Sequence, residues 1–191
     1  MLEVARKLSS KYKRFSDRGL AFATGLTRED ERWREPLLDA LAPKPGERIL
    51  DASIASVALA ADLASRFPET VVVGADLRDG VLSSSARASF DKVVCCMTLH
   101  TLADKTSFLR PLYRALRHNG SLYVADLDRP TDLNEQIALN VARIAYGPGV
   151  EPHFDGSWTT ALDEAGFTSV RRLSSHTFGM GRVSVVRGRK R

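Results

Sequence analysis

Cysteine is scarce in this sequence, and the motifs that usually accompany cysteine chemistry are absent. The 191 residues include two cysteines, the adjacent Cys95 and Cys96. Neighbouring cysteines reach disulfide geometry only with strain, and without a CxxC pair the pattern argues against a zinc or iron–sulfur site. We therefore expect no metal, two small buried apolar side chains and a reducing, cytoplasmic compartment.

Long apolar runs are also missing. No run approaches the roughly 18 residues of a membrane helix, and residues 1–16 lack the apolar core of a secretory signal. We expect neither a membrane-spanning helix nor a secretory signal in this protein. The hydrophobic fraction of 43% and the charged fraction of 27% exclude a disordered or fibrous class. The length suits one domain with its own core.

Positive charge is concentrated at the two ends. Residues 1–18 hold six Lys/Arg and two acids, and residues 165–191 hold seven Lys/Arg and no acid. The residues between them are therefore net negative. Basic termini of this kind either contact the phosphates of a nucleic acid or remain solvated, and the sequence leaves both readings open.

Helical and extended patterns alternate along the chain. Residues 1–45 are expected to form a helical cap, ended by the proline- and glycine-rich residues 42–46, and residues 46–191 an α/β domain. Apolar spacing predicts four further helices, over 55–66, 104–118, 132–146 and 157–165. Apolar and β-branched runs predict six strands, over 48–52, 70–75, 90–98, 121–126, 168–177 and 182–187.

Two short segments complete this expectation. Residues 119–120, Asn-Gly, are expected to form the turn after the second of these helices, with His118 capping that helix. The last two strands are expected to pair as an antiparallel hairpin through residues 179–181. Alternating strands and helices otherwise favour a parallel sheet.

Five segments then carry a resemblance to a known family. They read LLDALAPKPGERILDAS, VVVGADL, FDKVVCCMTLHTLAD, FLRPLYRALRHNGSLYVADLDRP and GFTSVRRLSSHTFGMGRVSVVRGRK. In this order, over most of residues 33–190, the chain resembles the class I S-adenosylmethionine-dependent methyltransferases of the UbiE type, which methylate quinone precursors at carbon. The resemblance implies a Rossmann-like fold with strand order 3-2-1-4-5-7-6.

The resemblance also implies a site for S-adenosylmethionine. In the family, a DxGxGxG loop follows the first strand, and its glycines let the backbone approach the cofactor. Here Asp51 is kept, whereas Ser53, Ala55 and Val57 stand at the glycine positions, so the cofactor motif is degenerate. Each added Cβ narrows the space for a ligand, and β-branched Val57 narrows it most. The resemblance assigns cofactor contacts to Asp51, Ala52, Ser53, Ala55, Asp76, Leu77 and Thr98.

The spacing after the second strand differs from the family pattern. Asp76 stands where the family's acid binds the ribose hydroxyls, although a solvated acid at a strand end is the alternative. The segment 77–89 is too short for a helix, a strand and a loop. We therefore expect the third strand, an edge of the sheet, to be missing. The newly exposed edge is a candidate docking surface for a protein partner.

Candidate residues for the acceptor side lie near the ends of other strands. His100 follows a strand at the crevice where open α/β sheets bind ligands, and it is either a general base or a polar loop residue. Asp126 and Asp128 are either acids of the substrate cleft or capping and solvent-facing groups. Tyr12 resembles a family tyrosine that helps to close the site. No partner for His153 or His176 is visible in the sequence.

Three functions remain open at this point. The first is an active methyltransferase that acts on a small apolar or aromatic acceptor. The second is a catalytically inactive relative that serves as a scaffold or partner subunit. The third is a nucleic-acid-associated protein, for example one that binds RNA through its basic termini. The fold favours the first, and the altered glycine loop favours the second.

Overall fold

The fold is known from a computed structural model that describes residues 33–53, 57–74, 87–178 and 181–191. Within these ranges, no helix combines the length and the apolar character that crossing a bilayer requires. The expected helical cap lies mostly before residue 33, and the expected boundary at residues 45 and 46 stays a prediction.

One mixed sheet organises the described part of the chain. Its six strands are β1 (Arg48–Asp51), β2 (Val71–Gly74), β3 (Phe90–Cys96), β4 (Leu116–Leu127), β5 (Thr168–Phe178) and β6 (Gly181–Arg189). Their order is β2-β1-β3-β4-β6-β5. The first four strands run parallel, while β6 pairs antiparallel with both β4 and β5. From strand 2 onward the described strands follow the expected family order, and β2 is the edge among them. Residues 75–86 lie outside the described residues, so the expected loss of strand 3 stays a prediction.

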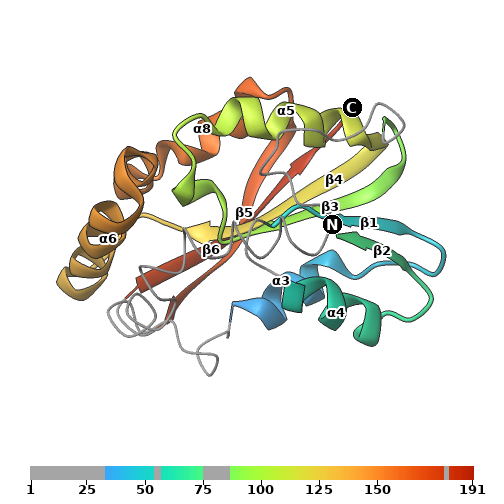
Figure 1. The fold of residues 1–191 in the computed structure, drawn as a ribbon, viewed down its shortest axis with the longest axis horizontal. Coiled ribbons are helices and arrows are strands. Elements are labelled where there is room, and N and C mark those ends of the chain that lie inside the picture. Colours follow the sequence, from blue (N-terminus) through green and yellow to red (C-terminus); the bar gives the residue numbers. More distant parts are fainter. Residues whose placement is uncertain (1–32, 54–56, 75–86, 179–180) are drawn as a thin grey trace, which may run out of the picture.

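Helices cover both faces of this sheet (Figure 1). The α-helices are α3 (Arg34–Leu41), α4 (Val57–Arg66), α5 (Lys105–Ala115), α6 (Leu133–Tyr146), α7 (Glu151–Asp155) and α8 (Thr160–Glu164). Three short 3-10 helices join them: η3 (Leu99–Thr101), η4 (Gly147–Val150) and η5 (Ser157–Thr159). In Figure 1, α5 and α8 lie above the sheet, α3 and α4 lie below it, and α6 stands at one end.

The core consists of two apolar clusters, one on each face of the sheet. Leu50, Val93 and Val124 belong to the cluster beneath α5 and α8. The opposite cluster includes residues of α3 and α4 together with alternate strand residues such as Ile49 and Val94. Successive strand residues point to opposite faces, which explains why neighbours enter different clusters.

The adjacent cysteines follow the same alternation. Cys95 packs in the cluster under α5, and Cys96 packs in the cluster of α3 and α4. Both are buried and free. Burial raises the pKa of both thiols well above the usual value, so neither is a ready thiolate. The expectation of two small buried apolar side chains is confirmed.

One expected boundary is wrong. The helix predicted to reach His118 ends at Ala115, and His118 is an exposed residue of β4 rather than a helix cap. Leu116 already pairs with Phe90, so tertiary strand pairing overrides the continuing helical pattern. Asn119, with φ of +64°, does adopt a turn conformation, but it lies inside the irregular first part of β4.

The two C-terminal strands pair as expected, although residues 179–180 lie outside the described part of the chain. Their register places Arg171 of β5 directly opposite Arg187 of β6. A buried carboxylate anchors this hairpin to α6: Glu135 accepts hydrogen bonds from Arg182 Nε at 3.0 Å and from Thr177 Oγ1 at 2.8 Å. The hairpin is therefore fixed to the helix that follows β4.

Candidate functional site

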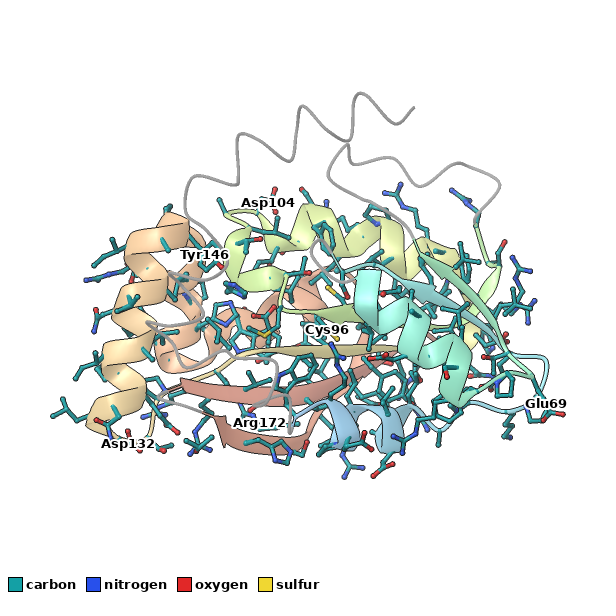
Figure 2. All side chains as sticks on the ribbon, turned by 60° about the horizontal axis from the view of Figure 1, so that its bottom comes forward. Glu69, Cys96, Asp104, Asp132, Tyr146 and Arg172 are labelled. Atoms are coloured by element: carbon teal, nitrogen blue, oxygen red, sulfur yellow. The ribbon has the colours of Figure 1, made fainter. Side chains whose placement is uncertain are left out.

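The sheet topology directs attention to the carboxyl ends of β1 and β3. The chain passes from β1 outward to β2 and then returns to β3 on the other side of β1. Such a reversal leaves a crevice between the two strands, where open α/β sheets bind their ligands. Figure 2 labels Cys96 near the middle of the molecule. This residue is the last of β3 and so marks the carboxyl end of that strand.

A serine closes the ends of these two strands. The Ser53 hydroxyl donates to Asp51 Oδ1 at 2.6 Å and accepts from the Cys96 backbone N–H at 2.9 Å. The Ser53 N–H donates to the same Asp51 oxygen at 3.0 Å. Burial raises the pKa of Asp51, against the lowering effect of these hydrogen bonds. The Ser53 hydroxyl, at the first altered glycine position, is therefore already hydrogen-bonded to the ends of β1 and β3.

Four of the residues predicted to form the site cannot be placed. Ala55, Asp76 and Leu77, expected to contact the cofactor, and Tyr12, expected in the acceptor cleft, lie outside the described residues. Asp51, Ala52, Ser53 and Thr98 do come together at the ends of β1 and β3. Their role toward a cofactor stays a prediction.

A buried histidine–aspartate pair forms the second part of the site. His100 lies on η3 just after β3, and Asp126 lies near the end of β4. His100 Nδ1 is 2.6 Å from Asp126 Oδ1. The carboxylate also accepts from the backbone N–H groups of Thr98 (2.9 Å), Leu99 (2.6 Å) and Leu127 (2.8 Å). Four donors thus converge on one side chain that is 0% exposed.

The ionisation of Asp126 follows from these partners. Burial alone raises the pKa of a carboxyl group, but the His100 ring and the hydrogen bonds from His100 and Leu127 outweigh it. The pKa of Asp126 is lowered to about 2. The residue is therefore a carboxylate at neutral pH. A carboxylate only accepts hydrogen bonds, so it holds the proton of His100 on Nδ1.

Aromatic rings surround His100. The Tyr146 ring meets it edge-on with centroids 4.8 Å apart, and the His153 ring lies 6.3 Å away. Figure 2 shows Tyr146 at the end of α6 that approaches the start of α5, near Asp104. His153 stacks on Trp158, and its Nδ1 donates to the Leu127 carbonyl at 2.5 Å.

Asp128 has a different role from Asp126, although the two are close in sequence. It accepts a hydrogen bond from Trp158 Nε1 at 3.1 Å and pairs with Arg172 at 2.7 Å. This buried carboxylate therefore ties η5 and β5 to the end of β4. It is neither a helix cap nor a solvent-facing group.

Sequence reasoning named His153 without a partner and missed two other residues near the His100–Asp126 pair, Tyr146 and Lys105. Tyr146, His153 and Lys105 come from α6, α7 and α5, and the chain brings them together only on folding. Nothing in their local sequence marks them, apart from the Gly-Pro-Gly break at residues 147–149 that ends α6. Within the described ranges, no three His, Cys, Asp or Glu side chains group closely enough to hold a metal ion.

Comparison with known proteins agrees with this architecture. Residues 39–124 match the family described as a methyltransferase domain. A demethylmenaquinone methyltransferase of Beutenbergia cavernae is 29% identical over 120 residues, covering 53% of this chain and 49% of that protein. The chain thus aligns with about half the length of this relative.

Solved structures show the same fold. Phosphoethanolamine N-methyltransferase 2 of Haemonchus contortus, solved with S-adenosyl-L-methionine, has a TM-score of 0.62 at 15% identity, covering 93% of this chain and 58% of that one. Human N-acetylserotonin methyltransferase, also solved with S-adenosylmethionine, has a TM-score of 0.60 at 15% identity, covering 96% and 58%. The class I methyltransferase fold and the resemblance to the UbiE type are confirmed.

Proposed function

We propose that this chain, which has the class I methyltransferase fold and resembles the UbiE type, transfers a methyl group from S-adenosylmethionine to a small apolar or aromatic acceptor. The observation that carries the proposal is the buried His100–Asp126 pair at the carboxyl ends of β3 and β4. The pair supplies a proton acceptor at the carboxyl ends of the strands, where this fold places its ligands.

His100 is the general base in this proposal. Because its Nδ1–H points to Asp126, the lone pair resides on Nε2. Nε2 takes the proton that the acceptor loses, for example from a phenolic hydroxyl. The ionised Asp126 then stabilises the resulting imidazolium and keeps the ring in one orientation. Asp126 is fully buried, so it acts through His100 rather than on the acceptor.

In this proposal the cofactor binds at the end of β1. The cofactor supplies an electrophilic methyl group when bound, and the protein positions the acceptor in line with it. The Ser53 hydroxyl is held by Asp51 and Cys96, so its side chain lies over the strand ends instead of projecting from the turn. Asp51, Ala52, Ser53 and Thr98 would hold the cofactor together with Ala55, Asp76 and Leu77.

A second candidate function rests on a different observation. The backbone N–H groups of five residues around the crevice already donate within the protein; these residues are Ser53, Cys96, Met97, Thr98 and Leu99. None of these five is available to a ligand without rearrangement. This favours an inactive scaffold that contacts a protein partner through the sheet edge, or RNA through the basic termini.

Isothermal titration with S-adenosylmethionine separates the two functions. We expect saturable binding in the micromolar range, with a matching rise in the melting temperature. Methyl transfer is then assayed with phenolic and quinol acceptors, because the acceptor class is part of the proposal. We also propose a cytoplasmic location. An absence of both heat and thermal shift at millimolar cofactor contradicts the methyltransferase and supports the scaffold.

A further inference from the structure

Lys105 is a buried cation close to the histidine–aspartate pair. It is the first residue of α5 and is only 5% exposed. Its ammonium donates to the Leu102 carbonyl at 2.8 Å and to the Gly149 carbonyl at 2.5 Å. Burial lowers the pKa of this lysine, and the nearby Asp126 charge opposes that shift. Burying a charge is unfavourable, so a lysine held here calls for a physical reason.

The two carbonyls belong to separate segments that meet at His100. Leu102 directly follows η3, which carries His100, and Gly149 lies in η4. The segments approach so closely that a Cβ on Gly149 would lie 2.7 Å from the Leu102 oxygen and 2.9 Å from the His100 oxygen. Two backbones pressed together in this way need a donor for their carbonyl groups. Lys105 supplies it to both.

The η4 segment also fixes one neighbour of the His100 ring. Tyr146 immediately precedes η4 and meets His100 edge-on. Asp126 holds the ring at Nδ1. The position of η4 relative to η3 therefore sets how His100 lies between its carboxylate and the tyrosine.

We infer that Lys105 is a positioning residue that fastens η3 to η4 and thereby holds His100 in hydrogen-bonding geometry with Asp126 and in contact with Tyr146. In catalytic terms the inference rests on the proposed function, because it assumes that His100 acts as the base. The geometric part does not depend on it.

Nuclear magnetic resonance of the free protein with 15N-labelled histidine tests the geometric part. The chain has four histidines, and the His100→Gln variant identifies the His100 Nδ1–H resonance. The short bond to Asp126 predicts a downfield, slowly exchanging proton. Lys105→Met, of similar length but without a donor, is expected to broaden or shift this resonance. Lys105→Gln, a neutral side chain with two amide N–H donors, is expected to keep it.

Thr106→Val is the matched control. Thr106 is the next residue of α5, and its hydroxyl donates to Glu164 on α8, away from η3 and η4. An unchanged resonance in Lys105→Met overturns the inference. An equal loss of the resonance in Thr106→Val also overturns it, because the effect would then reflect general loosening of the helix. So does an equal loss in Lys105→Gln, because the donor to the two carbonyls would then not be what holds His100.

Kinetics test the catalytic part. In Lys105→Met we expect kcat to fall on the order of tenfold to a hundredfold, with the KM for S-adenosylmethionine unchanged, since a small displacement of a reacting group has this effect. A raised KM with an unchanged kcat overturns the catalytic part. If no variant and no wild-type sample transfers methyl groups while the resonance responds as expected, the proposed function fails and the positioning of His100 stands.

Discussion

His153 stacks on Trp158, with ring centroids 5.3 Å apart and ring planes inclined by 13°. The histidine is fully buried, and its Nδ1–H donates to the Leu127 carbonyl. Its Nε2 is buried without a hydrogen-bond partner in the described part of the chain. Burial lowers the pKa of His153 to about 4, although the Asp126 charge opposes the shift. The folded protein therefore holds this ring neutral.

The first prediction concerns acid stability. Between the unfolded pKa of 6.5 and the folded pKa of about 4, the unfolded chain binds a proton at His153 that the folded chain does not. Stability is therefore fully present above pH 6.5 and falls as the pH drops through this window, by about 3 kcal/mol. Urea unfolding at several pH values measures it. His153→Gln should make the unfolding free energy less dependent on pH in this window, whereas the change His118→Gln at an exposed position should not. Equal slopes in all three proteins contradict the prediction.

The second prediction concerns Asp126→Asn. The change removes the negative charge beside His100 and leaves its backbone donors with a weaker acceptor. We expect the unfolding free energy to fall by about 3 kcal/mol. If methyl transfer is confirmed, we expect kcat to fall on the order of a thousandfold, since an amide no longer holds the tautomer. The unfolding free energy and kcat are measured on the same protein.

Asp128→Asn is the control for this change. Asp128 lies two residues along the same strand end and binds Trp158 and Arg172 instead of His100. It should lose stability and keep kcat. A comparable loss of kcat in both variants would show that the strand end as a whole, and not the Asp126 charge beside His100, governs turnover.

The third prediction compares Ser53→Gly with Ser53→Ala. Both variants lose the hydroxyl that joins Asp51 to the Cys96 N–H, so the unfolding free energy should fall by about 1 to 2 kcal/mol. Because the side chain already lies over the strand ends, the two variants should bind S-adenosylmethionine equally well in titration calorimetry. Markedly tighter binding by the glycine variant alone would mean that the Cβ obstructs the ligand.

The fourth prediction concerns Gly149→Ala. The new Cβ meets the Leu102 and His100 carbonyl oxygens at 2.7 and 2.9 Å, and both are backbone atoms that cannot turn aside. We expect a loss of about 1 to 3 kcal/mol in urea unfolding. Gly74→Ala is the comparison, because a Cβ there meets only the Ala60 Cβ at 4.0 Å. Equal stability in the two variants would contradict this packing.

Much of the fold could be predicted from local patterns. Apolar and β-branched runs identify the buried parallel strands, and proline or glycine marks most helix ends. The failure at the start of β4 has a physical cause. Residues 116–118 continue the helical pattern of α5, but Leu116 gains strand pairing with Phe90, and sequence distance hides that partner. The short helices η4 and α7 have too few residues to show a period.

Some residues of the candidate site could be identified from the sequence, but the contacts between them could not. His100 and Asp126 could be identified because each follows or ends a predicted strand at the expected crevice. Their direct contact joins residues 26 positions apart and could not be read from spacing. Lys105 and Gly149 are separated by 44 positions. Lys105 can bind carbonyl groups of both segments only because η3 and η4 approach each other closely in the fold. Long-range packing, rather than residue type, creates this part of the site.

The exposed Arg171 on β5 has a consequence for self-association. Among the described strands β5 is an edge, and Arg171 and Arg172 on it are exposed. An unprotected edge can extend its sheet with another molecule and so begin aggregation. A second copy docking edge to edge would bring like charges together, which is destabilising. We therefore expect the Arg171 charge to oppose such docking, most strongly when ionic strength is low, whereas the Arg172 charge is paired with Asp128.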